Sequence, residues 1–144
     1  MRVIGLVSIG LLLVAGLTFA QAQQQDQAQP VGTMMEFMYS MVHPASNAIL
    51  LSVNRGGPQT DKEWDEVQRS AVQLAAAANL LMMRPFARDQ EWTKDAKALV
   101  DLGAATYRAA KAKDSNALTA ASQQLDATCY ACHKQYRPNV HPKP

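Results

Sequence analysis

The sequence contains little that could cross-link a fold, because its 144 residues include only two cysteines, Cys129 and Cys132. Two cysteines three residues apart cannot staple distant parts of a chain, so a framework of disulfides is excluded. An excess of one charge is also missing, since 14 Lys and Arg against 12 Asp and Glu give a formal net charge of +2. With no charge run or basic stripe, neither nucleic acid nor a membrane surface is indicated as a partner.

Apolar runs long enough to cross a membrane are absent as well. The longest, Val3 to Leu17, has about 15 residues, where a spanning helix needs roughly 20. It follows Arg2 and precedes Phe19-Ala20-Gln21-Ala22, whose small residues suit signal peptidase. We therefore predict a cleaved signal peptide at residues 1–22, which leaves no stable membrane anchor. A flexible Gln-rich tether is expected at residues 23–32 and a Pro-rich tail at residues 138–144.

No segment alternates apolar and polar residues with a period of two, so strands are not expected. From Thr33 onward the chain instead has four helical segments separated by three short polar breaks. The clearest segment follows a capping box of Thr60 and Glu63 and is expected to end near Arg84-Pro85. Its apolar stripe has spacings of three and four residues and consists of Trp64, Val67, Ala71, Leu74, Ala78 and Leu81.

The next two segments show similar stripes. One begins after Asp89, runs to about Lys113 and has a stripe of Trp92, Ala96, Leu99, Gly103 and Ala110. The last begins after Asp114 or Ser115 and ends at Arg137-Pro138. Its inward stripe is predicted to be Leu118, Ser122, Leu125, Cys129, Cys132 and Tyr136.

The first segment is interrupted by Pro44, where the helix is expected either to kink or to begin again. Its predicted stripe is Met34, Met38, Met41, Ala45, Ala48 and Ser52. Since short breaks make neighbouring helices antiparallel, residues 33–137 are predicted to form an all-α, up-down-up-down antiparallel four-helix bundle.

The segment Cys129-Tyr130-Ala131-Cys132-His133 has the Cys-x-x-Cys-His pattern of c-type haem attachment. Its two thiols are spaced to add across the two vinyl groups of a haem, and the histidine can reach the iron. On a helix the three side chains share one face, which the stripe directs into the bundle. One covalent haem c is therefore the predicted cofactor. Because bacteria attach haem covalently outside the cytoplasm, the motif and the signal peptide agree on the periplasm.

Three other interpretations of the same residues remain. A thioredoxin-type redox pair normally opens a helix after a strand, whereas this pair closes a helix in an all-helical chain. A zinc site needs four ligands, and only His141 lies near Cys129, Cys132 and His133. A structural disulfide would leave His133 unexplained.

The motif continues as Lys134-Gln135-Tyr136-Arg137, and its place at the end of a four-helix chain resembles cytochrome c-prime and its low-spin relatives. The resemblance covers roughly residues 33–137. It implies thioether bonds at Cys129 and Cys132, His133 as an axial ligand, and Arg137 as a charge partner near the haem. It also implies that a second axial ligand, where there is one, is a methionine of the first helix. The sequence departs from the family pattern by placing His43-Pro44 within that helix.

The antiparallel arrangement itself identifies a second ligand, because the start of the first helix lies level with the end of the fourth. His133 lies about four residues before Arg137, and the same count from Thr33 or Met34 reaches the neighbourhood of Met38. The predicted axial ligands are therefore His133 and Met38. Left open are Met34, Met41, the offset Met35, His43 and an unligated site, since methionine stripes also fill cores.

The predicted function is one-electron transfer between periplasmic redox partner proteins, because histidine and methionine together saturate the iron and the thioether favours its reduced state. The alternative is a five-coordinate haem protein that binds nitric oxide or carbon monoxide. An enzyme is not expected, since the haem pocket has no evident acid or base apart from His43. The resemblance and the apolar stripes also allow a homodimer.

Overall fold

In a computed structural model of the protein, residues 31–139 are described, and within this range the chain is all helical and has no strand. The helical elements are α2 (Met34–Phe37), η1 (Met38–Val42), α3 (His43–Asn54), α4 (Asp61–Leu81), α5 (Gln90–Ala112) and α6 (Ser115–Tyr136). Because α2, η1 and α3 follow one another without a break, they form a single first helix, and the predicted all-α class is confirmed. The predicted signal peptide, tether residues 23–30 and tail residues 140–144 lie outside the described range.

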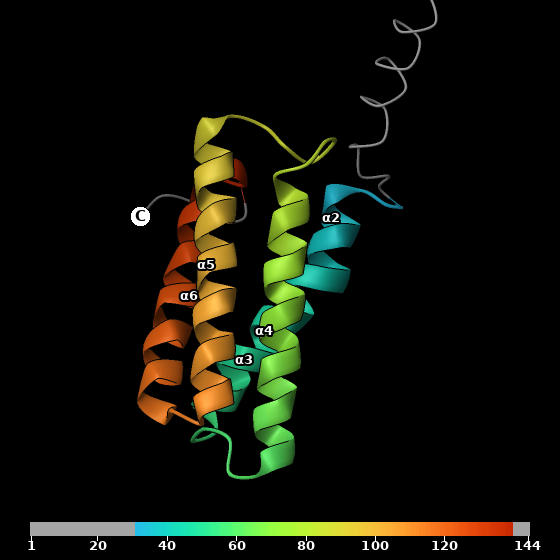
Figure 1. The fold of residues 1–144 in the computed structure, drawn as a ribbon. Coiled ribbons are helices and arrows are strands. Elements are labelled where there is room, and N and C mark those ends of the chain that lie inside the picture. The colour runs from blue at the N-terminus through green and yellow to red at the C-terminus, as the bar shows by residue number, and fades with distance from the viewer. Residues whose placement is uncertain (1–30, 140–144) are drawn as a thin grey trace, which may run out of the picture.

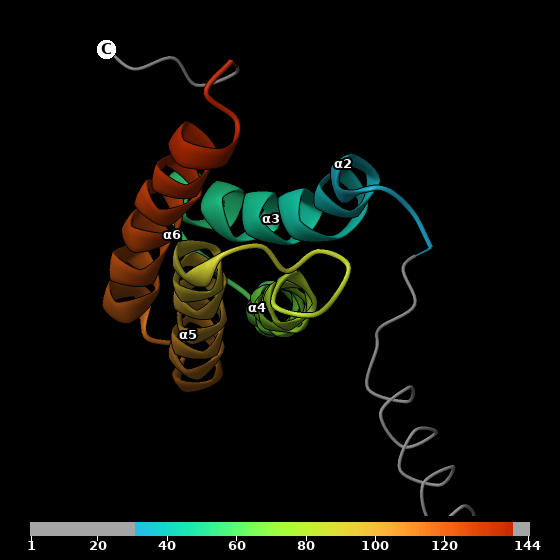
Figure 2. The same cartoon turned by 90° about the horizontal axis from the view of Figure 1, so that it is seen from above.

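The four long helices pack against one another around one apolar core. Figure 1 shows α4 and α5 side by side, with α6 against α5, while α3 contacts both α4 and α6. Seen from above, α4 and α5 are viewed end-on and the first helix lies across them (Figure 2). Within residues 31–139, none of these helices is both long and apolar enough to cross a membrane.

Helix α4 forms as its sequence predicts. The Thr60 hydroxyl accepts from the Glu63 amide at 3.3 Å, and the Glu63 carboxylate accepts from the Thr60 amide at 2.9 Å, which completes the capping box. Every residue of the predicted stripe is buried. The helix ends at Leu81, three residues before the predicted Arg84, because Pro85 has no amide to donate to the Leu81 carbonyl.

Helices α5 and α6 also begin at the predicted caps. The Asp89 carboxylate accepts from the Trp92 amide at 2.8 Å, and the Asp114 carboxylate accepts from the first amides of α6. All five residues of the predicted α5 stripe are buried. On α6 the stripe is buried as far as Leu125, whereas its last members, Cys129, Cys132 and Tyr136, are half-buried and pack against the core.

The first helix agrees with its predicted stripe at Ala45 and differs from it at Ala48. Ala48 was expected inside but is exposed, and the buried residues are Val42, Ala45, Ser46 and Ile49. The helix contains a π-helical turn, η1, where the His43 amide donates to the Met38 carbonyl five residues earlier. From the end of this turn, Val42, Ala45 and Ile49 are buried at spacings of three and four residues, so Ile49 takes the inward place that was predicted for Ala48.

Pro44 lies in the first turn of α3, as one of the two expected outcomes has it, but the helical path continues into that turn from η1 and does not start anew. It removes the amide that would have paired with the Ser40 carbonyl, so the wide turn falls where regular α-helical pairing is already broken. The nearby Met41 carbonyl accepts from the Gln73 side chain of α4 at 3.4 Å. The π turn is thus supported from the neighbouring helix.

Candidate functional site

The predicted site residues meet at two adjoining cavities between the first helix, α5 and α6. An inner cavity of about 40 Å³ and an outer cavity of about 220 Å³ share four lining residues, namely Met38, Trp92, Cys132 and His133. We call the two cavities together the cleft. It joins the start of the first helix to the end of α6, which the antiparallel count predicted to lie level.

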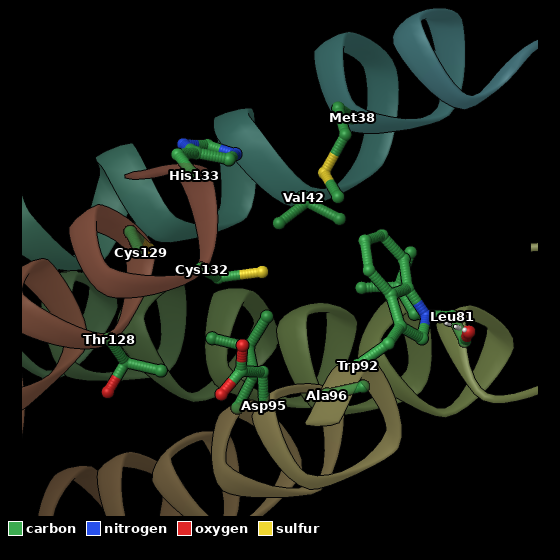
Figure 3. Close-up of a pocket in the computed structure, with 11 residues that line it drawn as sticks. Met38, Val42, Leu81, Trp92, Asp95, Ala96, Thr128, Cys129, Cys132 and His133 are labelled. Atoms are coloured by element: carbon green, nitrogen blue, oxygen red, sulfur yellow. Dashed lines mark hydrogen bonds between the residues drawn. The ribbon is translucent and has the colours of Figure 1, made fainter. Parts of the chain in front are cut away.

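Figure 3 shows how the side chains lie around the inner cavity. The Cys132 sulfur, the Met38 sulfur and the Trp92 ring point toward the same space. His133 comes from α6, on the same stretch of helix as the cysteines, and Met38 comes from the first helix. The fold therefore brings together all four residues predicted to bind the cofactor or its iron: Met38, Cys129, Cys132 and His133.

Both cysteines are free thiols and half-buried. Burial first, and the negative charge of Asp126 second, raise the pKa of Cys129 to about 11. Burial first, and the nearby Asp95 carboxylate second, raise the pKa of Cys132 to about 12. The thiols are therefore protonated at neutral pH, whereas a redox-active pair depends on a lowered thiol pKa. This speaks against the thioredoxin-type interpretation.

The zinc interpretation lacks a ligand set in the described part of the chain. Between residues 31 and 139, no three side chains of His, Cys, Asp or Glu lie together so that they could hold a metal ion. His141, the fourth ligand considered, lies outside that range. A haem iron needs only one or two protein ligands, so the same observation does not count against it.

The methionines of the first helix differ in which of the two cavities they line. Met38 lines both cavities, Met34 and Met35 line only the outer one, and Met41 lines neither. His43 is exposed, lines neither cavity and stacks on Tyr39 with a ring-centroid distance of 5.9 Å. Met38 is therefore the methionine that meets the motif residues most fully. Met34 comes next, because it packs against the core while Met35 is 67% exposed.

Several residues of the cleft were not identified from the sequence. Trp92 was assigned only to the core, yet it lines both cavities and is 3% exposed. Its indole nitrogen donates to the Leu81 carbonyl at 2.7 Å, which satisfies the acceptor that Pro85 leaves unpaired. Asp95 lies one helical turn after Trp92 and lines the inner cavity. The sequence did offer a signal for Asp95, because this acidic residue follows Trp92 by three residues, a spacing that places both on one face of the helix.

Tyr136 lines the outer cavity and makes polar and aromatic contacts with the start of α5. Its hydroxyl donates to the Asp89 carboxylate at 2.6 Å, and its ring meets Trp92 edge to face at 4.9 Å between centroids. The hydrogen bond from Tyr136 is the largest influence that lowers the pKa of Asp89, followed by that from the Trp92 amide. Burial, with the hydrogen bond to Asp89 second, raises the pKa of Tyr136 to about 12. At neutral pH the hydroxyl is thus the donor and the carboxylate is charged.

Two arginines border the outer cavity. Arg137 is exposed, and its amide donates to the His133 carbonyl at 2.7 Å at the end of α6. Arg88 was not identified from the sequence, and its guanidinium carbon lies 4.6 Å from the centre of the Trp92 ring. Two positive charges therefore lie at the outer edge of the cleft, and that of Arg88 lies beside the Asp89 carboxylate.

The chemistry of the lining fits a covalently bound haem. Two protonated thiols, a histidine and a methionine share the inner cavity, whose lining is otherwise apolar apart from Asp95 and Thr128, and the arginines line only the outer cavity. Each cavity is smaller than the roughly 300–1,000 Å³ usual for ligand pockets, so a group of this size requires side chains to move apart.

Comparisons of the chain with protein-family models, with curated proteins and with solved structures gave no match.

Proposed function

We propose that the protein is a c-type cytochrome of the cytochrome c-prime kind, which carries one haem c and transfers single electrons. The observation that carries this proposal is the cleft, where Cys129, Cys132 and His133 from α6 meet Met38 from the first helix. These four side chains are the covalent anchors and axial ligands that such a haem uses. When bound, the haem would supply an iron that accepts and releases one electron.

Each side chain has a distinct role in this proposal. Cys129 and Cys132 would hold the group covalently, since their thiols lie one turn apart on one helix. His133 would be one axial ligand and Met38 the other. With both axial positions taken by the protein, a substrate would find no open position at the metal, which suits an electron carrier better than an enzyme.

The surroundings favour a raised reduction potential. The inner cavity is lined mostly by apolar side chains, of which Leu81, Trp92 and Leu99 are buried, and Asp95 is its one acidic residue. A largely apolar setting and a thioether ligand both disfavour the extra positive charge of the oxidised iron. Arg88 and Arg137 at the outer edge are proposed as charge partners for acidic groups.

We also propose the up-down-up-down order for the four helices. The connections are short, at residues 55–60, 82–89 and 113–114, and short connections favour antiparallel neighbours. The direction of the colour gradient in Figure 1 reverses from each long helix to the next, which supports this order. The order is what would place the start of the first helix beside His133.

Export to the periplasm follows from the signal peptide predicted at residues 1–22 and from the site of haem attachment in bacteria. The partners would then be periplasmic redox proteins, with a homodimer as a further proposal.

The test is an absorption spectrum of the oxidised and reduced protein, purified from a bacterial host that matures c-type cytochromes. Six-coordinate, low-spin bands and slow binding of carbon monoxide to the reduced form are expected. High-spin bands with rapid carbon monoxide binding would replace electron transfer by gas binding. A protein with no haem bands would refute both functions.

A further inference from the structure

The proposed ligand His133 lies at the end of α6, where a helix is least firmly held. His133 lies in the last turn of the helix, which ends at Tyr136. The last carbonyls of a helix lack partners within it, so terminal turns open more readily than the rest. An axial ligand in such a turn needs something outside the helix to hold it in place.

Tyr136 supplies a contact of that kind. It lies one turn after His133, and its hydroxyl donates at 2.6 Å to Asp89, which is 47 residues away in the sequence. The bond joins a neutral donor to a charged acceptor, and hydrogen bonds of this type are stronger than those between neutral groups. The Tyr136 ring also packs edge to face on Trp92.

Asp89 links this contact to the start of α5. Its Oδ1 atom accepts both from the Tyr136 hydroxyl and from the Trp92 amide, at 2.6 and 2.8 Å. One carboxylate oxygen therefore ties the first turn of α5 to the last turn of α6. Arg88 covers the junction, with its guanidinium carbon 4.6 Å from the Trp92 ring centre and 5.4 Å from that of Tyr136.

We propose that Asp89 and Tyr136, covered by Arg88, form a latch that positions His133 by fixing the last turn of α6 against the start of α5. The role of His133 as a ligand rests on the proposed function, whereas the latch itself does not. The same latch sets the place of Trp92, which borders both cavities of the cleft. Asp89 and Tyr136 are thus positioning residues, and neither lines the inner cavity.

The test compares three substitutions in the full-length protein. Tyr136→Phe removes the hydroxyl and keeps the ring against Trp92. Asp89→Ser keeps an N-cap for α5 and removes the carboxylate. Tyr107→Phe is the matched control, because Tyr107 is also half-buried but lies on α5 in a separate groove beside α4.

Amide hydrogen exchange of residues 129–137 is the first measurement, and it does not depend on haem. Both latch variants should exchange several-fold faster in this segment, because the charge-assisted hydrogen bond that they lose lies at the surface, where solvent weakens it. Combining them should add little to either alone, since both break the same contact. Exchange that matches Tyr107→Phe would overturn the latch.

The second measurement concerns positioning. In the haem-loaded protein, Tyr136→Phe should increase the high-spin fraction and lower the reduction potential, while Tyr107→Phe should change neither. A lower melting temperature with an unchanged spectrum and potential would show a stabilising contact without a positioning role. A protein that carries no haem but shows the faster exchange would refute the proposed function and keep the latch.

Discussion

Gly103 lies at a close approach between α4 and α5, where even a methyl group has no room. A Cβ atom added there would come within 2.9 Å of the Ala75 Cβ atom and 3.0 Å of the Ala71 carbonyl oxygen. These neighbours are backbone or the first carbon of a side chain, so they cannot rotate away. The substitution Gly103→Ala therefore forces the two helices apart.

Gly103→Ala has two opposing effects on stability, because it overpacks the contact between the helices and raises the helix propensity. Whether stability falls or rises shows which effect is larger. Overpacking a core typically costs about 1–3 kcal/mol, while alanine in place of glycine within a helix contributes roughly 0.5–1 kcal/mol of stability. We expect a net loss of about 1–2 kcal/mol in the free energy of unfolding. For a domain of this size that lowers the melting temperature by roughly 5–10 °C.

Thermal and urea unfolding followed by circular dichroism would measure the change. The matched control is Ala76→Gly at an exposed position of α4, which reports the propensity difference alone and should cost about 1 kcal/mol. If Gly103→Ala raises the melting temperature instead, propensity outweighs packing and the close approach of α4 and α5 is wrong.

Three further predictions concern the cleft and the capping box. Met38→Ala should give a high-spin haem that binds carbon monoxide and has a lower reduction potential, while Met41→Ala should leave the spectrum unchanged. A high-spin haem in Met41→Ala and an unchanged spectrum in Met38→Ala would assign the ligand to Met41. In the haem-free chain at pH 8, Cys129 should react with iodoacetamide about 100-fold and Cys132 about 1,000-fold more slowly than an ordinary thiol, because their pKa values are raised to about 11 and about 12. Rates equal to that of an ordinary thiol would contradict their burial. Hydrogen bonds from the amides of Gln59 and Thr60 lower the pKa of Glu63, so its contribution to stability is present above pH 4.5 and is lost as the pH falls through the lowered value. Unfolding of Glu63→Gln across this range should therefore show less acid dependence than the wild type, and parallel curves would refute the capping contribution.

Much of the fold could be predicted because local signals agree in three of the four long helices. In α4, the Thr60 cap and an unbroken stripe from Trp64 to Leu81 determine which face is buried. The stripe predicted for the first helix is confirmed at Ala45 and wrong at Ala48, which is exposed while Ile49 is buried. Ala48 and Ile49 follow Ala45 by three and four residues, and both spacings fit one face of a helix, so periodicity alone did not choose between them.

The residues of the site also differ in whether local sequence patterns could identify them. Cys129, Cys132 and His133 form one contiguous motif, and Met38 follows from counting along antiparallel helices. The hydrogen bond between Asp89 and Tyr136 joins residues that are far apart in the sequence, and each also has a local explanation. Asp89 is a helix cap and Tyr136 a stripe residue, so neither pattern revealed that they meet.

The most direct test of the central claim is whether haem stays on the polypeptide after denaturation and extraction with acidified acetone. The protein would be produced in a host that matures c-type cytochromes, and its mass and haem absorbance measured after extraction. We predict a mature chain that carries the mass of one haem, and a chain with both Cys129→Ser and Cys132→Ser that carries none. A wild-type chain of unmodified mass would contradict covalent haem attachment at this cleft.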